Sequence, residues 1–131
     1  MIAGIGIDSV DVTRFENFAQ WPHEKLAQIF STKEIDYCLT VPIKSAERFA
    51  ARFAAKEAFF KALCGTHPNA QFILRPMLPH IEVTQLGTNG SVGLIIHWHE
   101  LDMQQEKITV HLSLTHTTHT ATAIVTIENE R

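Results

Sequence analysis

The feature that most limits how this chain can fold is one long helical pattern near its centre. The pattern runs from Lys44 to Leu63, and Gly65 and Pro68 end it, because glycine suits the turn after a helix and proline cannot continue one. The whole chain has 131 residues, of which 45% are hydrophobic. That length is enough for one compact domain with a core, so residues 1–131 are predicted to form a single domain.

Strand patterns flank the long helix on both sides. Near the N-terminus, Ile5 and Ile7 alternate with Gly4, Gly6 and Asp8, which indicates a strand over residues 2–8 whose glycine-bearing face leaves room for another group to approach. The other predicted strands all follow the long helix: His80–Leu86, Ser91–Ile96, Ile108–Leu114 and Ala121–Ile127. Residues 66–79 contain three prolines and are predicted to form a long loop.

Shorter helices are expected before the long one and between the later strands. Ser31 precedes Glu34 by three residues, which is the spacing of a capping box at a helix start, and this helix is predicted to end near Leu39. One more helix is predicted at residues 10–19, where Trp21-Pro22 breaks it, and a second short helix follows this break and ends at Ile29. Another short helix is predicted at residues 97–105. The fold class is therefore α+β, with one N-terminal strand, several helices including a long central one, and then a mostly antiparallel sheet.

Charge and composition argue against several classes of protein. The net charge of −3 and the pI near 6.2 provide no overall basic field for nucleic acid or an anionic membrane, so any anion site must be local. Residues 1–10 lack the basic start of a signal peptide, and no apolar run is long enough to span a membrane. Cys38 and Cys64 lack metal-binding spacing and are expected to be reduced packing residues. We therefore expect a soluble, cytoplasmic protein.

Two carboxylates are the main candidates for chemistry. A rotation of about 100° per residue places Glu57 in the apolar stripe of the long helix, where a carboxylate needs a cation, a metal or hydrogen-bond donors to compensate its burial. Lys61, four residues on, could form an ordinary intrahelical ion pair with it. Asp8 alone could be a helix N-cap. Together, however, Asp8 and Glu57 would provide two hard oxygen ligands that suit Mg²⁺ bound to substrate phosphates.

Basic side chains on the same helix suggest an anion site. Arg48, Arg52 and Lys56 recur every four residues, and a solvated charged face is the simplest interpretation, which we favour for Lys56. Arg52 lies at the edge of the apolar stripe and could bind a phosphate with two parallel hydrogen bonds. His116 ends a predicted strand and could either contact an anionic ligand or cap the hairpin turn. No zinc signature, P-loop or nucleophile elbow is present.

Three segments carry a family resemblance. The first is Gly4-Ile5-Gly6-Ile7-Asp8 followed by Arg14-Phe15, and the second is Arg52-Phe53-Ala54-Ala55-Lys56-Glu57-Ala58-Phe59-Phe60-Lys61-Ala62. The third, weaker match is the strand 110–116 with Ala121 and Ala123 after it, where the family usually has serine in place of Thr115. Together these segments resemble the holo-acyl-carrier-protein synthase type of 4′-phosphopantetheinyl transferase.

The resemblance implies a 4′-phosphopantetheinyl transferase-like fold and a definite reaction. Such an enzyme moves 4′-phosphopantetheine from coenzyme A to a serine of an apo acyl carrier protein and releases adenosine 3′,5′-bisphosphate, in support of fatty acid biosynthesis. By this resemblance Asp8 and Glu57 would hold Mg²⁺, and Lys61 would meet the pyrophosphate. Either Glu57 or a metal-held water could accept the serine proton.

The resemblance also implies how the substrates bind. Arg52 and His116 would contact coenzyme A phosphates, and Arg14 would face the acidic helix of the carrier protein. Relatives of this short type form homotrimers with the active site at each subunit interface. The first helical region offers few cations beyond Arg14 and Lys25 for an acidic carrier. The loop after the long helix also departs from the family, which usually has a glycine-rich turn there.

Two other functions remain open at this point. One is a non-catalytic domain that binds coenzyme A or a carrier protein, although the presence of Asp8, Glu57 and Lys61 favours an enzyme. The other is a metal-dependent hydrolase of small pyrophosphates, which would use the same three residues but would need no carrier and so no Arg14.

Overall fold

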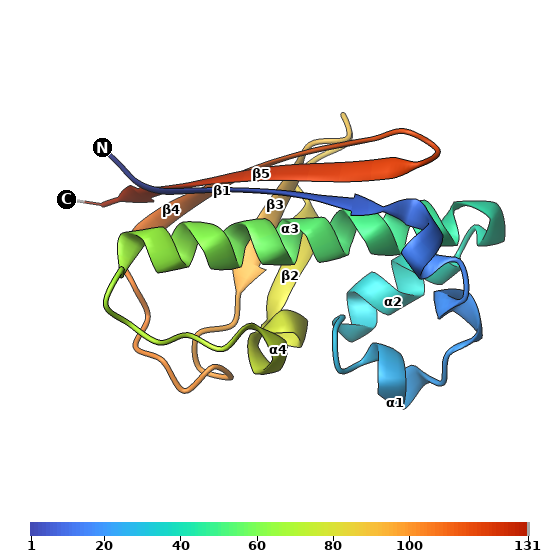
Figure 1. The fold of residues 1–131 in the computed structure, drawn as a ribbon, viewed down its shortest axis with the longest axis horizontal. Coiled ribbons are helices and arrows are strands. Elements are labelled where there is room, and N and C mark those ends of the chain that lie inside the picture. Colours follow the sequence, from blue (N-terminus) through green and yellow to red (C-terminus); the bar gives the residue numbers. More distant parts are fainter. Residues whose placement is uncertain (131) are drawn as a thin grey trace.

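The computed structural model describes residues 1–130 and has the predicted α+β order of elements (Figure 1). The helices are α1 (His23–Leu26), α2 (Thr32–Leu39), α3 (Ser45–Thr66) and α4 (Leu74–Met77), with short 3₁₀ turns at Val12–Phe15, Phe18–Gln20, Pro42–Lys44 and Leu78–His80. The strands are β1 (Ile2–Asp11), β2 (Ile81–Gln85), β3 (Val92–Ile96), β4 (Ile108–His116) and β5 (Thr120–Asn129).

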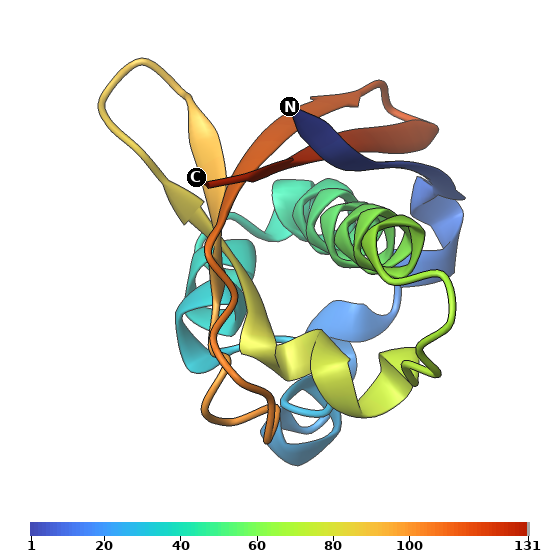
Figure 2. The same cartoon turned by 90° about the vertical axis from the view of Figure 1, so that its left-hand side faces the viewer.

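The N-terminal strand and the last two strands form one antiparallel sheet in the order β1-β5-β4. The long helix α3 runs beneath this sheet and roughly along it (Figures 1 and 2). Strand β1 can approach α3 closely because Gly4 and Gly6 face the helix. A Cβ atom at Gly6 would lie 2.8 Å from the backbone nitrogen of Ala62 and nearer still to the carbonyl oxygen of Ala58. The prediction that the glycine-bearing face of the strand receives another group is therefore confirmed.

A second, two-stranded antiparallel sheet is formed by β2 and β3. Strand β3 lies next to β4, and β2 contacts both α2 and α3, so this small sheet covers the side of α3 away from β1 (Figure 2). The predicted later strands therefore exist, but they belong to two sheets rather than one. Among residues 1–130, no helix is both long and apolar enough to cross a membrane.

The core is built around α3. Small side chains at four-residue intervals allow the sheet to pack close to the helix, and all four are fully buried: Ala50, Ala54, Ala58 and Ala62. On another side of α3, Phe53 packs against Phe15, whose ring centroid is 5.5 Å away, and Phe15 packs against Phe18 at 4.6 Å. These aromatic contacts attach the segment after β1 to the middle of α3.

Several predicted elements differ from the structure. The helix predicted at residues 10–19 is wrong, because β1 continues to Asp11, which pairs with Thr120, and only 3₁₀ turns follow. The helix predicted at residues 97–105 is also wrong, since that segment forms turns in which Asp102 has a positive φ of 52°. The predicted loop at residues 66–79 contains α4. In each case tertiary pairing or turn geometry outweighs a weak local periodicity.

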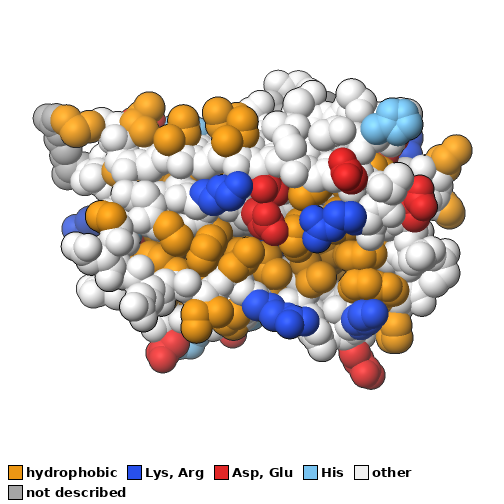
Figure 3. Space-filling model, in the orientation of Figure 1, with side chains coloured by type: hydrophobic (Ala, Val, Ile, Leu, Met, Phe, Trp, Pro, Cys, Tyr) orange, Lys and Arg blue, Asp and Glu red, His pale blue; other side chains and the backbone are white. Residues whose placement is uncertain are grey.

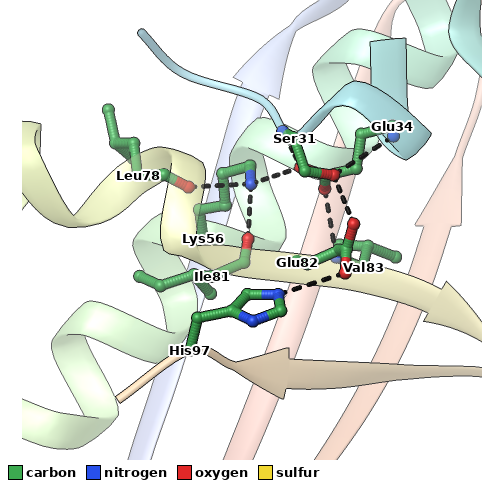
Figure 4. Close-up of polar contacts among 8 residues, drawn as sticks. All are labelled: Ser31, Glu34, Lys56, Leu78, Ile81, Glu82, Val83 and His97. Atoms are coloured by element: carbon green, nitrogen blue, oxygen red, sulfur yellow. Dashed lines mark hydrogen bonds and ion pairs between the residues drawn. The ribbon is translucent and has the colours of Figure 1, made fainter. Parts of the chain in front are cut away.

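The prediction of a solvated Lys56 is wrong, because its side chain is fully buried. Its ammonium group donates hydrogen bonds to Glu34 Oε1 at 2.7 Å and to the carbonyl oxygen of Leu78 at 2.8 Å, and also to the carbonyl oxygen of Ile81 (Figure 4). Periodicity places Lys56 only on a flank of α3. The approach of α2 and β2 across that flank buries it and supplies its partners.

Candidate active site

Asp8 and Lys61 meet where β1 passes over α3. Asp8 lies within β1, not at a helix start, and its side chain is 9% exposed, so it is not an N-cap. The Lys61 ammonium nitrogen lies 3.2 Å from Asp8 Oδ1 and 3.0 Å from the carbonyl oxygen of Ile7. Lys61 therefore pairs with the carboxylate on the strand, and the intrahelical pair with Glu57 is not formed.

Glu57 faces the same place from α3, half-buried rather than enclosed in the apolar stripe. Burial raises the pKa of Glu57 above its ordinary value of 4.5, and the negative charge of Asp8 and a hydrogen bond shared with the Asp8 carboxyl raise it further. Lys61 and Arg14 act in the opposite direction but do not outweigh these causes. The two acidic side chains are thus close enough for each to affect the charge of the other, and they repel each other when both are ionised.

The pair has the properties of an incomplete cation site. Asp8 Oδ2 is buried and has no hydrogen-bond partner within residues 1–130, although buried carboxylate oxygens are normally satisfied. No three His, Cys, Asp or Glu side chains in that range are grouped to hold a metal ion by themselves. Two carboxylates suit Mg²⁺ in particular, because this ion usually takes one or two protein carboxylates and completes its shell with waters and substrate phosphates.

Arg14 connects Glu57 to a groove in the protein. Figure 3 shows one face of the molecule, on which acidic side chains lie between basic ones with hydrophobic side chains below them. The Arg14 guanidinium, which acts on Glu57, lies 5.3 Å from the ring centroid of Phe53, and Phe53 also lines a cavity of about 360 Å³. This cavity, here called the apolar groove, is lined by Trp21, Lys25, Gln28, Ile29, Phe53, Leu74, Arg75 and Leu78.

A second cavity, of about 350 Å³, collects basic side chains and is here called the anion pocket. Its wall contains Tyr37, Lys44, Glu47, Arg48, Ala51, Arg52, Gln85, Gly90, Val92, Leu114 and His116. Arg52 is only 7% exposed, and its Nε atom has no hydrogen-bond partner within residues 1–130. Its guanidinium lies 4.3 Å from the ring centroid of Tyr37, and that of Arg48 lies 4.1 Å from the same ring. The pocket thus holds a buried guanidinium with unused donors.

His116 lies at the end of β4, as predicted, and faces the anion pocket. Its Nδ1 atom is 3.7 Å from Glu47 Oε2. Within the β4–β5 turn, the Thr117 backbone nitrogen donates to the carbonyl oxygen of Thr120 at 2.8 Å, and the Thr117 hydroxyl oxygen accepts from the backbone nitrogens of His119 and Thr120. His116 lines the anion pocket, and contact with a ligand there stays a prediction.

The predicted site residues fall into two groups rather than one. Asp8 lies on β1, with Glu57 and Lys61 on α3, whereas His116 lies on β4, and β5 separates these two edge strands. With about 4.8 Å between neighbouring strands, the two edges are about 10 Å apart. The wall of the anion pocket contains none of Asp8, Glu57 and Lys61. One chain therefore presents an acidic centre at one sheet edge and an anion pocket at the other.

Several residues in these cavities were not predicted from the sequence. Tyr37 and Gln85 in the anion pocket carry no local signal, because α2 and β2 are brought to α3 only by the fold. Arg75 in the apolar groove lies in the segment predicted to be a loop. Two sequence signals pointed to the anion pocket: the basic spacing of residues 48 and 52, and His116 at the end of a predicted strand.

Comparisons with known proteins agree with this fold. A family model of the 4′-phosphopantetheinyl transferase superfamily matches residues 4–110. The chain is 39% identical to a holo-[acyl-carrier-protein] synthase of Treponema denticola over 98% of this chain and 99% of that one, and 35% identical to one of Syntrophus aciditrophicus over 98% and 97%. Among solved structures, a holo-(acyl-carrier-protein) synthase from Bacillus anthracis in complex with CoA (3′,5′-ADP) has a TM-score of 0.77 and 28% identity, covering 99% of both chains. The predicted fold is confirmed, and the chain belongs to the 4′-phosphopantetheinyl transferase superfamily.

Proposed function

We propose that this chain transfers the 4′-phosphopantetheine group of coenzyme A to a serine of an apo acyl carrier protein and releases adenosine 3′,5′-bisphosphate. The observation that carries the proposal is the meeting of Asp8 and Glu57 beside Lys61, with one buried Asp8 oxygen left without a partner. Similarity to holo-[acyl-carrier-protein] synthases along nearly the whole chain supports this choice of substrates. We also propose that residues 1–131 act as one domain.

In this proposal Asp8 and Glu57 hold Mg²⁺, and the donor set fits that ion. When bound, Mg²⁺ neutralises charge that develops on the pyrophosphate oxygens. Lys61 is 54% exposed on its side chain, so it can turn from Asp8 to a pyrophosphate oxygen and share that task. The carrier serine oxygen forms a bond to the phosphorus next to pantetheine as the bond to the bridging oxygen breaks. The serine proton passes to a nearby base, and the bisphosphate leaves with the electron pair of the broken bond.

The anion pocket is proposed to bind coenzyme A phosphates through Arg52 and His116. Because the pocket and the acidic centre lie at opposite edges of the sheet, a complete site would combine the β1 edge of one subunit with the β4 edge of another. The outer face of the sheet supports such an assembly, since Ile5, Ile7 and Ile124 are 62%, 58% and 39% exposed there. We therefore propose a homotrimer with active sites at the subunit interfaces.

The carrier protein is proposed to dock over Arg14 and the apolar groove. Arg14 links the acidic centre to this groove, because its charge acts on Glu57 while its guanidinium lies over the Phe53 ring. Lys25 and Arg75 add positive charge at the groove. An acidic helix with an apolar side chain would find complementary charge and a cavity next to the carboxylates.

We further propose that the product serves fatty acid biosynthesis in the cytoplasm. Both cysteines are free thiols, as is typical of proteins in a reducing compartment.

The decisive experiment incubates the protein with coenzyme A, Mg²⁺ and an apo acyl carrier protein and measures the mass of the carrier. We expect the carrier to gain one phosphopantetheine group, and Glu57→Gln to prevent this. Asp36→Asn, which changes an exposed carboxylate on α2, is the matched control and should transfer normally. Release of the bisphosphate with an unmodified carrier would instead identify a hydrolase. Saturable coenzyme A binding without reaction would identify a binding domain.

A further inference from the structure

Arg52 has an unusual environment for a buried arginine. Besides the anion pocket, it lines a smaller cavity of about 250 Å³ between α2, α3 and β2. Two buried carboxylates, Glu34 and Glu82, line that same smaller cavity. A buried guanidinium normally pairs with a carboxylate when one is near. Arg52 nevertheless keeps a buried Nε atom that has no hydrogen-bond partner in the described range 1–130, and other donors occupy both carboxylates.

The donors around Glu34 come from three elements (Figure 4). Glu34 Oε1 accepts hydrogen bonds from the Lys56 ammonium at 2.7 Å and from the backbone nitrogen of Ser31 at 2.9 Å. Glu34 Oε2 accepts from the backbone nitrogen of Val83 at 3.0 Å. Lys56 is the one cation in this set, so it supplies the charge that balances the buried Glu34 carboxylate.

Glu82 is held in a similar way by different partners. The Ser31 hydroxyl donates to its Oε2 atom, and the His97 ring nitrogen Nε2 lies 3.2 Å from its Oε1 atom (Figure 4). Burial raises the pKa of Glu82, but these two contacts and the nearby Lys33 outweigh burial and keep the pKa below its ordinary value. Glu82 is therefore a carboxylate with partners of its own.

We propose that Lys56 is a positioning residue for the anion pocket: by holding Glu34, it leaves the Arg52 guanidinium free for a phosphate of coenzyme A. This inference rests on the proposed function of that pocket. Without the Lys56 ammonium, Glu34 would be a buried carboxylate with no cation, which is strongly unfavourable. Two cations line the same cavity, and of these Arg52 is buried whereas Lys33 is exposed, so Arg52 is the buried cation available to Glu34. Capture of Arg52 by Glu34 would neutralise the guanidinium and occupy its donors.

The test measures the Kd of coenzyme A by isothermal titration calorimetry on the full chain. Lys56→Met is expected to weaken binding about 10- to 100-fold, which is the loss of one charge-assisted hydrogen bond, and Arg52→Gln is expected to weaken it similarly. The double variant Glu34→Gln with Lys56→Met is expected to bind nearly as well as the wild type, because no carboxylate remains to capture Arg52. Lys33→Met removes an exposed lysine from the same cavity and should leave the Kd almost unchanged.

Recovery in the double variant alone does not separate positioning from general stability, because Glu34→Gln also removes the unpaired buried charge. The separating measurement is Arg52→Gln in the Lys56→Met background: a captured Arg52 predicts no further loss of binding, whereas a purely structural role predicts that Arg52→Gln weakens binding as much as it does in the wild type. That result, or an unchanged Kd in folded Lys56→Met, would overturn the inference about Lys56 but would not contradict the proposed binding of coenzyme A in the anion pocket. An unchanged Kd in Arg52→Gln would overturn the proposed pocket and the inference together. If Lys56→Met does not fold, Lys56→Gln is used, since its amide can still donate to the carbonyl oxygens that Lys56 meets.

Discussion

The close passage of β1 over α3 predicts a large effect for the substitution Gly6→Ala. The new Cβ would lie 2.8 Å from the backbone nitrogen of Ala62 and 2.9 Å from the carbonyl carbon of Ala58, with the carbonyl oxygen of Ala58 nearer still. Ordinary contacts of a Cβ atom begin at 3.4 Å. All of these neighbours are backbone atoms of α3, so no side-chain rotation can relieve the clash.

Lengthening the Ala62 contact from 2.8 Å to an ordinary 3.4 Å requires the strand to move away from the helix by about 0.6 Å, and the closer Ala58 oxygen requires a larger movement. The displacement is therefore on the order of 1 Å. Overpacking of this kind typically lowers the free energy of unfolding by about 1–3 kcal/mol. The functional effect should be larger, because Asp8 is two residues from Gly6 on the same face of β1. A misplacement of about 1 Å can reduce a rate about 100-fold.

The assay combines urea unfolding with the rate of phosphopantetheine transfer to an apo carrier. Gly65→Ala is the matched control, because a Cβ at Gly65, which lies near the end of α3, has no neighbour within 4 Å. That control should keep its activity. If Gly6→Ala kept wild-type stability and rate, the contact between β1 and α3 would not determine how Asp8 and Glu57 are placed, and the reasoning would be refuted.

Four further predictions concern other parts of the molecule. Glu57→Gln should abolish transfer while the circular dichroism spectrum stays that of the folded protein; activity in this variant would contradict the metal assignment. Because the pKa of Glu57 is raised in the folded state, its contribution to the free energy of unfolding of the metal-free protein should be present below pH 4.5 and be lost as the pH rises through the raised pKa. Urea unfolding at several pH values should show this difference between wild type and Glu57→Gln, and Mg²⁺ should stabilise only the wild type at the higher pH. Ile7→Glu on the exposed sheet face should yield monomers in light scattering, and an intact trimer would refute the assembly through this face. Burial raises the pKa of the Cys38 thiol to about 12, so iodoacetamide at neutral pH should modify Cys64 first, as peptide mass mapping would show.

The sequence predicted those elements whose signals are local. The long helix was predicted at residues 44–63 and spans residues 45–66, because its periodicity acts within the helix itself. The prediction that Gly65 ends the helix is wrong, since Gly65 lies inside α3 and His67 is the C-cap. The capping box is confirmed, with the Ser31 hydroxyl oxygen accepting from the backbone nitrogen of Glu34 at 3.2 Å. The predicted helix at residues 10–19 failed because pairing of β1 with β5, more than a hundred residues away, decided the conformation of residues 10 and 11.

The candidate site shows the same division. Helical rotation identified Glu57 as a carboxylate that needed a partner, and two glycines beside Asp8 indicated a strand face that another element approaches. Periodicity also placed Lys56 on a flank of α3, but its burial could not be inferred, because Glu34 lies 22 residues away and reaches it only when α2 folds back. A charged side chain is solvated or buried according to what packs over it.

The sequence by itself determined the long helix, the glycine-bearing strand, and the types of side chain that each of these elements can contribute to a contact between them. These properties depend on backbone propensity and periodicity, which act over a few residues. Only the tertiary structure decided that Asp8 meets Glu57 and Lys61, that Lys56 holds Glu34, and that the Arg52 Nε atom has no hydrogen-bond partner among residues 1–130. Each of these outcomes depends on which distant segments share a solvent-excluded space, where charges must be balanced by whatever lies nearest.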